Sequence, residues 1–297
     1  MTNIFRGTGV ALVTPFKDGQ VDYDALARLI EHCINGGLDY LVSLGTTGES
    51  VTLSKKEKIE VLDFTVRQAA GRVKIVGGFG GNNTADVIES IKNYHFEGVD
   101  GILSVSPAYS KPTQEGIYQH FMAIEAVAPR PIILYNVPGR TSSNISSATT
   151  LRLAHASKKF VAIKEASGNL RQCMDIVKNR PENFAVVSGD DNLTLPMLGF
   201  GMDGVISVVA NAYPQEFSDM VRAGFANDFE TARALHYSLV DLVDLLFVEG
   251  NPGGIKAVLE QLGICSKKMR LPLVDISQET YDKLAEQVAT LKKPVIA

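Results

Sequence analysis

A lysine at the end of an apolar run is the residue of this sequence best suited to covalent chemistry. Lys164 closes the run Phe-Val-Ala-Ile-Lys (160–164), so its aliphatic stem would lie against a dry interior. Such surroundings disfavour the ammonium form and favour a neutral amine, which can attack a carbonyl group and form a Schiff base. The same position equally suits a lysine that pairs with the adjacent Glu165 or extends to water. Position alone therefore leaves the role of Lys164 open.

Two further features could complete such a site. Tyr135 ends the apolar run before that of Lys164, and a phenol beside a Schiff-base lysine can carry protons to and from the substrate. The segment Gly-Thr-Thr-Gly-Glu-Ser (45–50) follows another apolar run, and its backbone N–H groups could converge on a carboxylate. Each feature also has a simpler interpretation, a core tyrosine and a plain turn. The pairing of Tyr135 with Lys164 favours the functional one.

The sequence alternates short apolar runs with amphipathic segments. Eight runs rich in β-branched residues predict buried parallel strands: 9–14, 40–43, 73–77, 101–105, 132–136, 160–164, 184–188 and 204–208. Residues that favour helix starts precede or open the amphipathic segments: Asp22, Ser54 (with Glu57 in a capping-box pattern), Thr84, Thr113 and Ser146. Eight strands, each followed by a helix, predict an α/β fold, the (β/α)8 or TIM barrel. A doubly wound sheet is the alternative, but its glycine fingerprint is missing from residues 77–82.

After the eighth run the pattern is helical only. Helices are predicted over 214–223, 228–248, 253–262 and 278–291, the first of them being the eighth barrel helix. We therefore expect a barrel with the active site in residues 1–224 and a C-terminal helical region in 225–297 that packs against it. In such barrels the reacting groups lie at the carboxyl ends of the strands, where Lys164 and Tyr135 would share one mouth.

Composition argues against several other classes of protein. The formal net charge is −4 and no stretch is rich in Lys and Arg, so nucleic-acid binding is not expected. No apolar run is long enough to span a membrane, and a cytoplasmic enzyme is expected. The three cysteines are far apart and form no Cys-x-x-Cys pair, which favours reduced, buried thiols: Cys33, Cys173 and Cys265.

A metal site is not expected either. All five histidines are predicted to lie on helices, away from strand ends and without a ligand cluster: His32, His95, His120, His155 and His236. The only Asp-Asp pair, Asp190-Asp191, is expected to cap the seventh helix.

Six segments, in order along the chain, resemble dihydrodipicolinate synthases, a family of pyruvate-dependent class I aldolases. The segments are Gly-Val-Ala-Leu-Val-Thr-Pro-Phe (9–16), Gly-Thr-Thr-Gly-Glu (45–49), Tyr-Asn-Val-Pro-Gly-Arg-Thr (135–141), Ile-Lys-Glu-Ala-Ser-Gly-Asn (163–169), Ser-Gly-Asp-Asp (188–191) and Gly-Val-Ile-Ser-Val (204–208). The resemblance implies a TIM barrel that condenses pyruvate with L-aspartate 4-semialdehyde to 4-hydroxy-tetrahydrodipicolinate, in lysine and diaminopimelate biosynthesis. It implies no metal and no organic cofactor.

The resemblance also implies roles for particular residues. Lys164 would form the imine, and Tyr135 would carry protons, linked through Thr47 to Tyr109. Thr46 and Thr47 would bind the carboxylate of pyruvate. In the family the tyrosine at the position of Tyr109 reaches into the neighbouring subunit's active site. A homotetramer built as a dimer of dimers is therefore expected.

Three other residues would border the site. Gly189 and Ile206 would line it through their backbone carbonyls. Arg140 would hold the carboxylate of the second substrate, as a guanidinium fork suits a carboxylate. A sugar-acid lyase of the same superfamily, which cleaves N-acetylneuraminate or a related acid, is the enzymatic alternative and would not need Arg140. A binding or regulatory barrel without catalysis is the non-enzymatic alternative.

One departure from the family concerns regulation. Relatives that L-lysine inhibits usually carry a histidine on the helix after the Gly-Glu-Ser segment and a second tyrosine just before the interdigitating one. Here that helix offers Lys55 and Lys58, and Ala108 replaces the tyrosine, although Asn82 and Asp86 keep a partial match. Because Lys58 would repel a cationic effector, inhibition by L-lysine is expected to be weak or absent.

Overall fold

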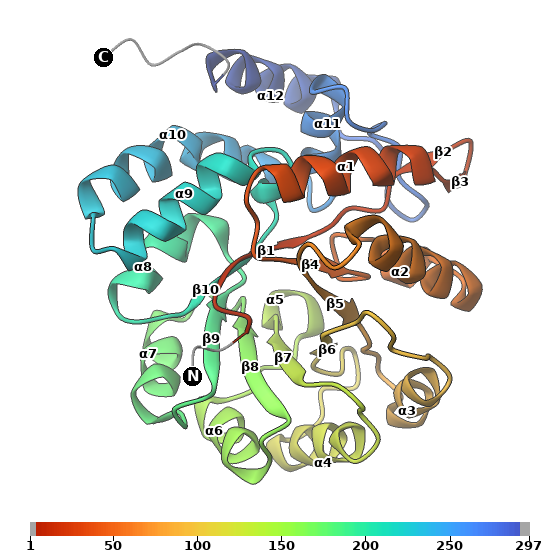
Figure 1. Cartoon of the computed structure of the whole chain (residues 1–297), viewed down its shortest axis with the longest axis vertical. Coiled ribbons are helices and arrows are strands. Elements are labelled where there is room, and N and C mark those ends of the chain that lie inside the picture. The colour runs from red at the N-terminus through yellow and green to blue at the C-terminus, as the bar shows by residue number, and fades with distance from the viewer. Residues whose placement is uncertain (1–3, 292–297) are drawn as a thin grey trace.

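Eight parallel strands form a ring in the computed structural model, which describes residues 4–291 (Figure 1). The strands are β1 Gly7–Ala11, β4 Tyr40–Ser43, β5 Lys74–Gly78, β6 Gly101–Val105, β7 Ile132–Asn136, β8 Phe160–Glu165, β9 Ala185–Ser188 and β10 Gly204–Ser207. They follow one another around the ring in chain order, and β10 pairs with β1 to close it. The predicted TIM barrel is confirmed.

The first strand differs most from its prediction. A strand is predicted over 9–14, whereas β1 covers Gly7–Ala11. The chain then turns to meet the segment after β4, where the Thr14 hydroxyl donates to the Gly48 carbonyl over 2.7 Å. Because this hydrogen bond joins residues 34 positions apart, the apolar residues of the run 9–14 do not by themselves reveal where the strand ends. A two-stranded hairpin that the apolar pattern did not predict follows: β2 Phe16–Lys17 and β3 Gln20–Val21.

The barrel interior is filled by alternate residues of the strands. Its buried apolar side chains include Tyr40, Val42, Val76, Leu103, Ile133, Tyr135, Ala162, Val187 and Ile206. The strands approach closely around Tyr40, because a Cβ atom added to Gly9 would lie 2.1 Å from the tyrosine ring. The interior is thus a packed core, and only the strand ends are left to form a site.

Helices cover the outside of the ring. The longer ones between the strands are α1 Tyr23–Asn35, α2 Lys55–Ala69, α3 Thr84–Lys92, α4 Gln114–Glu125, α6 Ser147–Ala156 and α7 Leu170–Asn179, with shorter α5 Pro138–Thr141 and α8 Thr194–Gly199. The predicted capping box of Ser54 and Glu57 is present, and Asp22, Thr113 and Ser146 each cap a helix through the side chain. Thr84, predicted to start a helix, is the first residue of α3, and the side chain of Asn83 caps that helix.

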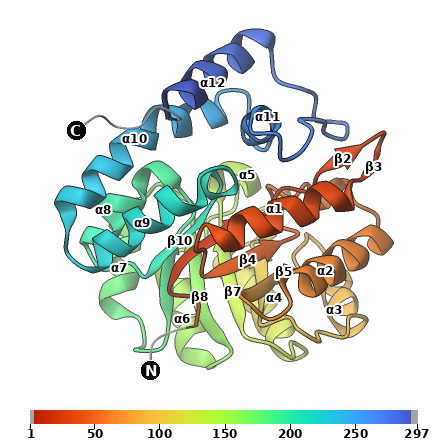
Figure 2. The ribbon, with the colours of Figure 1, turned by 45° about the horizontal axis from the view of Figure 1, so that its top comes forward.

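The C-terminal helices lie over one end of the barrel. They are α9 Pro214–Phe225, α10 Phe229–Phe247, α11 Gly253–Gln261 and α12 Gln278–Leu291, close to their predicted bounds. Figure 2 shows α11 and α12 at the end where α5 follows β7, which is the carboxyl end of the strands. The expected packing of this region against the barrel is therefore observed. The division into residues 1–224 and 225–297 stays a prediction.

A buried ion pair fastens the C-terminal region to the barrel. Lys256 of α11 and Glu49 of the segment after β4 have fully buried side chains, and the Lys256 ammonium group donates to the Glu49 carboxylate. Its second acceptor is the Lys268 carbonyl, 2.9 Å away. Burial lowers the pKa of Lys256, and the neighbouring Glu49 carboxylate opposes that shift. Each charge is thus buried only because the other is beside it.

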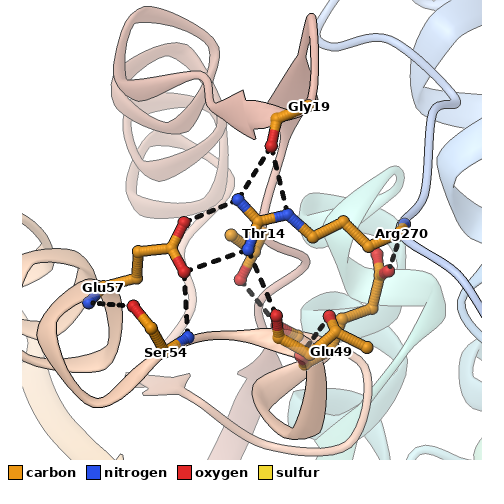
Figure 3. Close-up of polar contacts among 8 residues, drawn as sticks. Thr14, Gly19, Glu49, Ser54, Glu57 and Arg270 are labelled. Atoms are coloured by element: carbon orange, nitrogen blue, oxygen red, sulfur yellow. Dashed lines mark hydrogen bonds and ion pairs between the residues drawn. The ribbon is translucent and has the colours of Figure 1, made fainter.

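Arg270 makes a second connection next to the first (Figure 3). Its guanidinium group donates to both oxygens of Glu57 over 2.6 and 3.0 Å and to the Gly19 carbonyl over 2.9 and 3.2 Å. The Arg270 backbone N–H donates to Glu49 over 3.2 Å. The Arg270 guanidinium, together with the N–H of Ser54, holds the pKa of Glu57 at about 2. Lys256 and Arg270 of the C-terminal region therefore hold the segment after β4 at the Glu49 carboxylate, and Arg270 also holds the start of α2 at Glu57.

We expect Lys256→Met to lower the free energy of unfolding by about 3–5 kcal/mol, because it leaves the Glu49 carboxylate buried without its partner. Urea unfolding followed by circular dichroism, at matched protein concentration, measures the change. The double variant Lys256→Met/Glu49→Gln should recover part of the loss.

Lys283→Met is the matched control, because it removes a lysine from the exposed ion pair with Glu279 on α12. Its effect should stay below about 1 kcal/mol. Equal effects of the two lysine substitutions would contradict the structural importance of the Lys256–Glu49 pair.

Candidate active site

Lys164 and Tyr135 lie side by side at the carboxyl ends of neighbouring strands. The register of β7 and β8 pairs the two residues, so their side chains point to the same face of the sheet, the barrel interior. Both are buried, with 5% and 6% of their surface exposed. The Lys164 ammonium nitrogen lies 4.6 Å from the centre of the Tyr135 ring. The structure therefore brings together the two residues that the sequence singled out for proton transfer and imine chemistry.

Glu165 is held on the other side of the strand. Its carboxylate accepts hydrogen bonds from Asn136 over 2.8 Å, Gln172 over 2.7 Å and Ser167 over 2.6 Å. Burial raises the pKa of Glu165, and these donors oppose the shift. Because neutral donors satisfy this carboxylate, it is not placed to neutralise Lys164. The alternative in which the lysine only pairs with Glu165 receives no support.

Gly189 makes room for the Lys164 side chain. A Cβ atom at Gly189 would lie 3.0 Å from the Lys164 Cε atom and 2.6 Å from the Ala166 Cβ atom. Such distances require a neighbour to move, so the absence of a side chain lets the lysine take its place. Ile206 is fully buried in the same interior cluster as Tyr135. Of the two predicted border residues, Gly189 therefore lies against Lys164, and Ile206 belongs to the buried interior cluster that contains Tyr135.

The prediction that the pair Asp190-Asp191 caps the seventh helix was wrong. Asp191 accepts hydrogen bonds from the backbone N–H groups of Val208 over 3.0 Å and Val209 over 2.8 Å, just after β10. Asp190 precedes a short 3-10 helix, but its side chain makes no capping hydrogen bond. Burial raises the pKa of Asp191 to about 6, while the N–H donors and the positive charge of Lys164 oppose the shift. Asp191 therefore ties β9 to the segment after β10 near the lysine.

The segment after β4 presents its threonines at the same end of the barrel. Thr47 is buried, with 2% of its surface exposed, and Thr46 is half-buried. The Thr47 hydroxyl accepts a hydrogen bond from the Asn251 side chain over 2.9 Å. Sequence reasoning missed Asn251, since an Asn-Pro pair between two helices carries no signal of a contact 204 residues away.

Two other predicted residues lie apart from this centre. Arg140 is exposed on α5, directly after the strand of Tyr135. Tyr109 is 91% exposed in the segment after β6 and has a φ angle of +69°. Within one chain it points to solvent, so the structure does not bring it to Thr47. Its location suits a residue that acts on another molecule.

The described part of the chain contains no group of three or more His, Cys, Asp or Glu side chains that could hold a metal ion. Four of the histidines lie on helices as predicted, whereas His95 lies in the loop after α3 and contacts Asp63 at 3.2 Å. The prediction for His95 was wrong because α3 ends at Lys92. All three cysteines are free and buried, as expected. No helix within residues 4–291 is long and apolar enough to cross a membrane.

A buried lysine beside a tyrosine at the mouth of a TIM barrel is the arrangement of a class I, lysine-dependent aldolase. The model of the dihydrodipicolinate synthetase family matches residues 4–291, and the chain belongs to this family.

Individual relatives agree with that assignment. A 4-hydroxy-tetrahydrodipicolinate synthase of Parabacteroides distasonis is 50% identical over 287 residues, covering 96% of this chain and 97% of the relative. The dihydrodipicolinate synthase of Aquifex aeolicus superposes with a TM-score of 0.95 at 44% identity, covering 99% and 100% of the two chains. The chloride-inhibited enzyme of Acinetobacter baumannii, solved with pyruvate, has a TM-score of 0.92 at 38% identity and covers 96% and 98%.

Gly189→Ala should slow the reaction of the Lys164 amine with a small keto acid by about 10- to 100-fold, because the new methyl group displaces the lysine side chain. Borohydride reduction at timed intervals, followed by mass spectrometry, measures this rate. Gly199→Ala at the end of α8 is the control, since a Cβ there meets only an ordinary contact at 3.9 Å. An unchanged rate in folded Gly189→Ala protein would mean that the close approach has no functional importance.

Proposed function

We propose that this chain condenses pyruvate with L-aspartate 4-semialdehyde to give 4-hydroxy-tetrahydrodipicolinate, in lysine and diaminopimelate biosynthesis. The observation that carries the proposal is the buried Lys164 amine beside the Tyr135 ring at the open end of the barrel. The names of the relatives support the reaction, and the pyruvate in the Acinetobacter baumannii enzyme supports the first substrate. They favour this reaction over the sugar-acid lyase and the non-catalytic barrel.

The reaction starts at the Lys164 amine. The neutral amine attacks the ketone carbon of pyruvate, and loss of water gives a cationic imine. The imine acidifies the methyl group, and removal of one proton gives an enamine. The enamine carbon adds to the aldehyde of the second substrate. The amino group of that substrate then attacks the imine carbon, closes the ring and releases Lys164, so the water lost in forming the imine is the only other product.

Tyr135 moves the protons that these steps require. Its ring lies against the Lys164 side chain, so the phenol belongs to the residue beside the nitrogen that forms the imine. Thr46 and Thr47 bind the pyruvate carboxylate, and Thr47 links Tyr135 to a tyrosine. We propose that this tyrosine is Tyr109 of a neighbouring subunit, since Tyr109 is exposed in its own chain. The active enzyme is then a homotetramer built as a dimer of dimers.

The second substrate is held at the mouth. Arg140 is exposed on the short helix after Tyr135, so its guanidinium group can reach a carboxylate outside the lysine pocket. The backbone carbonyls of Gly189 and Ile206 border the opposite side. Neither a metal ion nor an organic cofactor takes part, because the lysine imine itself withdraws the electrons. A cytoplasmic location remains a prediction.

Regulation by L-lysine is a separate part of the proposal. A cavity of about 350 Å³ lies between α2 and the segment after β5 and is lined by Lys55, Lys58, Asn82 and Asp86. Burial, together with the positive charge of Lys55, lowers the pKa of Lys58. Glu89 also lines the cavity, but it pairs with Lys55 at 3.9 Å, whereas Lys58 has no ion pair within residues 4–291. The charge of Lys58 therefore disfavours the ammonium groups of L-lysine, which binds there weakly or not at all.

Pyruvate and borohydride together should add one reduced pyruvate unit to the protein, and peptide mapping should find it on Lys164. Lys164→Arg, which keeps the charge but cannot form the imine, is the control and should take up no label. A label on another lysine, or none in the wild type, would refute the assignment.

Tyr135→Phe should keep the fold but lower turnover by about 10²-fold or more, since it removes the acid–base group and keeps the ring. A coupled assay with pyruvate and aspartate semialdehyde measures turnover, and circular dichroism checks the fold. Near-normal turnover would limit Tyr135 to packing.

L-lysine should inhibit the wild-type enzyme weakly or not at all in the same assay. Lys58→His, combined with Ala108→Tyr, replaces the repelling charge and restores the missing tyrosine, so inhibition should strengthen. Half-inhibition of the wild type at submillimolar L-lysine would contradict the electrostatic argument.

A further inference from the structure

Asn251 reaches from the C-terminal region into the site. It lies between α10 and α11, and its side-chain nitrogen Nδ2 donates to the Thr47 hydroxyl oxygen over 2.9 Å. Only 8% of Asn251 and 2% of Thr47 is exposed. A hydrogen bond between two such groups is shielded from competing water, so it sets their orientation firmly.

The direction of this hydrogen bond matters for chemistry. A threonine hydroxyl has one proton to donate and two lone pairs to accept with. Because Asn251 occupies a lone pair, the Thr47 proton is left to point elsewhere. The other amide atom, Oδ1 of Asn251, is buried and has no hydrogen-bond partner among the described residues. In this orientation of the amide, Asn251 acts on Thr47 as a donor.

The ion pair between Lys256 and Glu49 keeps Asn251 and Thr47 next to each other. Glu49 is two positions after Thr47, and Lys256 is five positions after Asn251; the two form the fully buried ion pair. Two independent contacts thus join the same short segments, one through charge and one through the amide. The Asn251 side chain can therefore hold the Thr47 hydroxyl in a single orientation.

We infer that Asn251 is a positioning residue that commits the Thr47 hydroxyl to donate its proton into the active site. The inference rests on the proposed function, in which that proton meets the pyruvate carboxylate or the Tyr135 relay. It assigns the C-terminal region a part in catalysis. Asn251 itself does not touch the reacting atoms.

Replacing the donor by an acceptor tests the inference. Asn251→Asp keeps the shape, but its carboxylate draws the Thr47 proton away from the site. We expect kcat to fall by about 10²-fold near pH 8. Asn251→Ala, whose place a water molecule can take as donor, should lose only about 10-fold.

The pH profile separates this effect from a general disturbance. A buried aspartic acid has a raised pKa and regains a donor proton as the pH falls. As the pH falls from 8 to 5.5, the activity of Asn251→Asp relative to the wild type should therefore rise. The activity of Asn251→Ala relative to the wild type should stay constant over the same range. A purely structural role predicts no such difference.

A double-mutant cycle with Thr47→Val gives a second readout. Without the Thr47 hydroxyl there is nothing for Asn251 to orient, so Asn251→Asp or Asn251→Ala should add little further loss. The cycle with Asn251→Ala tests this coupling even if the aspartate variant does not fold. Asn227→Asp, the same change at an exposed position before α10, is the control and should match the wild type.

The outcomes distinguish the inference from the proposed function. If borohydride traps no pyruvate on the wild-type Lys164, the proposed function fails. If the wild type traps pyruvate and turns over, two results overturn the inference: equal losses for Asn251→Asp and Asn251→Ala at every pH, or losses at Asn251 and Thr47 that multiply. A larger, pH-dependent loss in Asn251→Asp, coupled to Thr47, supports it.

Discussion

Closure of the eight parallel strands into a ring is the constraint on which the rest of the molecule depends. It sends alternate residues of every strand into one interior and brings the carboxyl ends of all eight strands to one mouth. Lys164 and Tyr135 share that mouth only because β7 and β8 pair them in register. A shift of one residue in either strand would turn one of the two side chains outward. The chemistry of the site is therefore a consequence of strand register.

The structure buries several ionisable side chains, and each of them is stabilised by a different kind of partner. Glu165 is surrounded by neutral donors, Asp191 by backbone N–H groups, and Lys256 is paired with the fully buried Glu49. Lys164 lies against an aromatic ring. A carboxylate partner favours the ammonium form of a lysine, which cannot act as a nucleophile. Lys256 has such a partner, whereas Lys164 has no ion pair within residues 4–291, so Lys164 is the better suited of the two to react.

The C-terminal helices are more than a cover for the barrel. Lys256 holds the Glu49 carboxylate and Asn251 holds the Thr47 hydroxyl, and both of these groups belong to the segment that follows β4. This segment is short and irregular, and loops of this kind owe their conformation to what packs on them. A region remote in sequence thereby controls the part of the site where a substrate carboxylate would bind.

Much of this protein followed from the sequence by itself. Continuous apolar runs revealed all eight barrel strands, because strands buried on both faces need no polar alternation, and Lys164 and Tyr135 stood out at the ends of two of them. Tertiary structure alone decided the early end of β1, the contacts of Asp191, and the hydrogen bond from Asn251 to Thr47. These features join residues far apart in the chain, and local propensity carries no information about which distant backbone or side chain will satisfy a buried polar group.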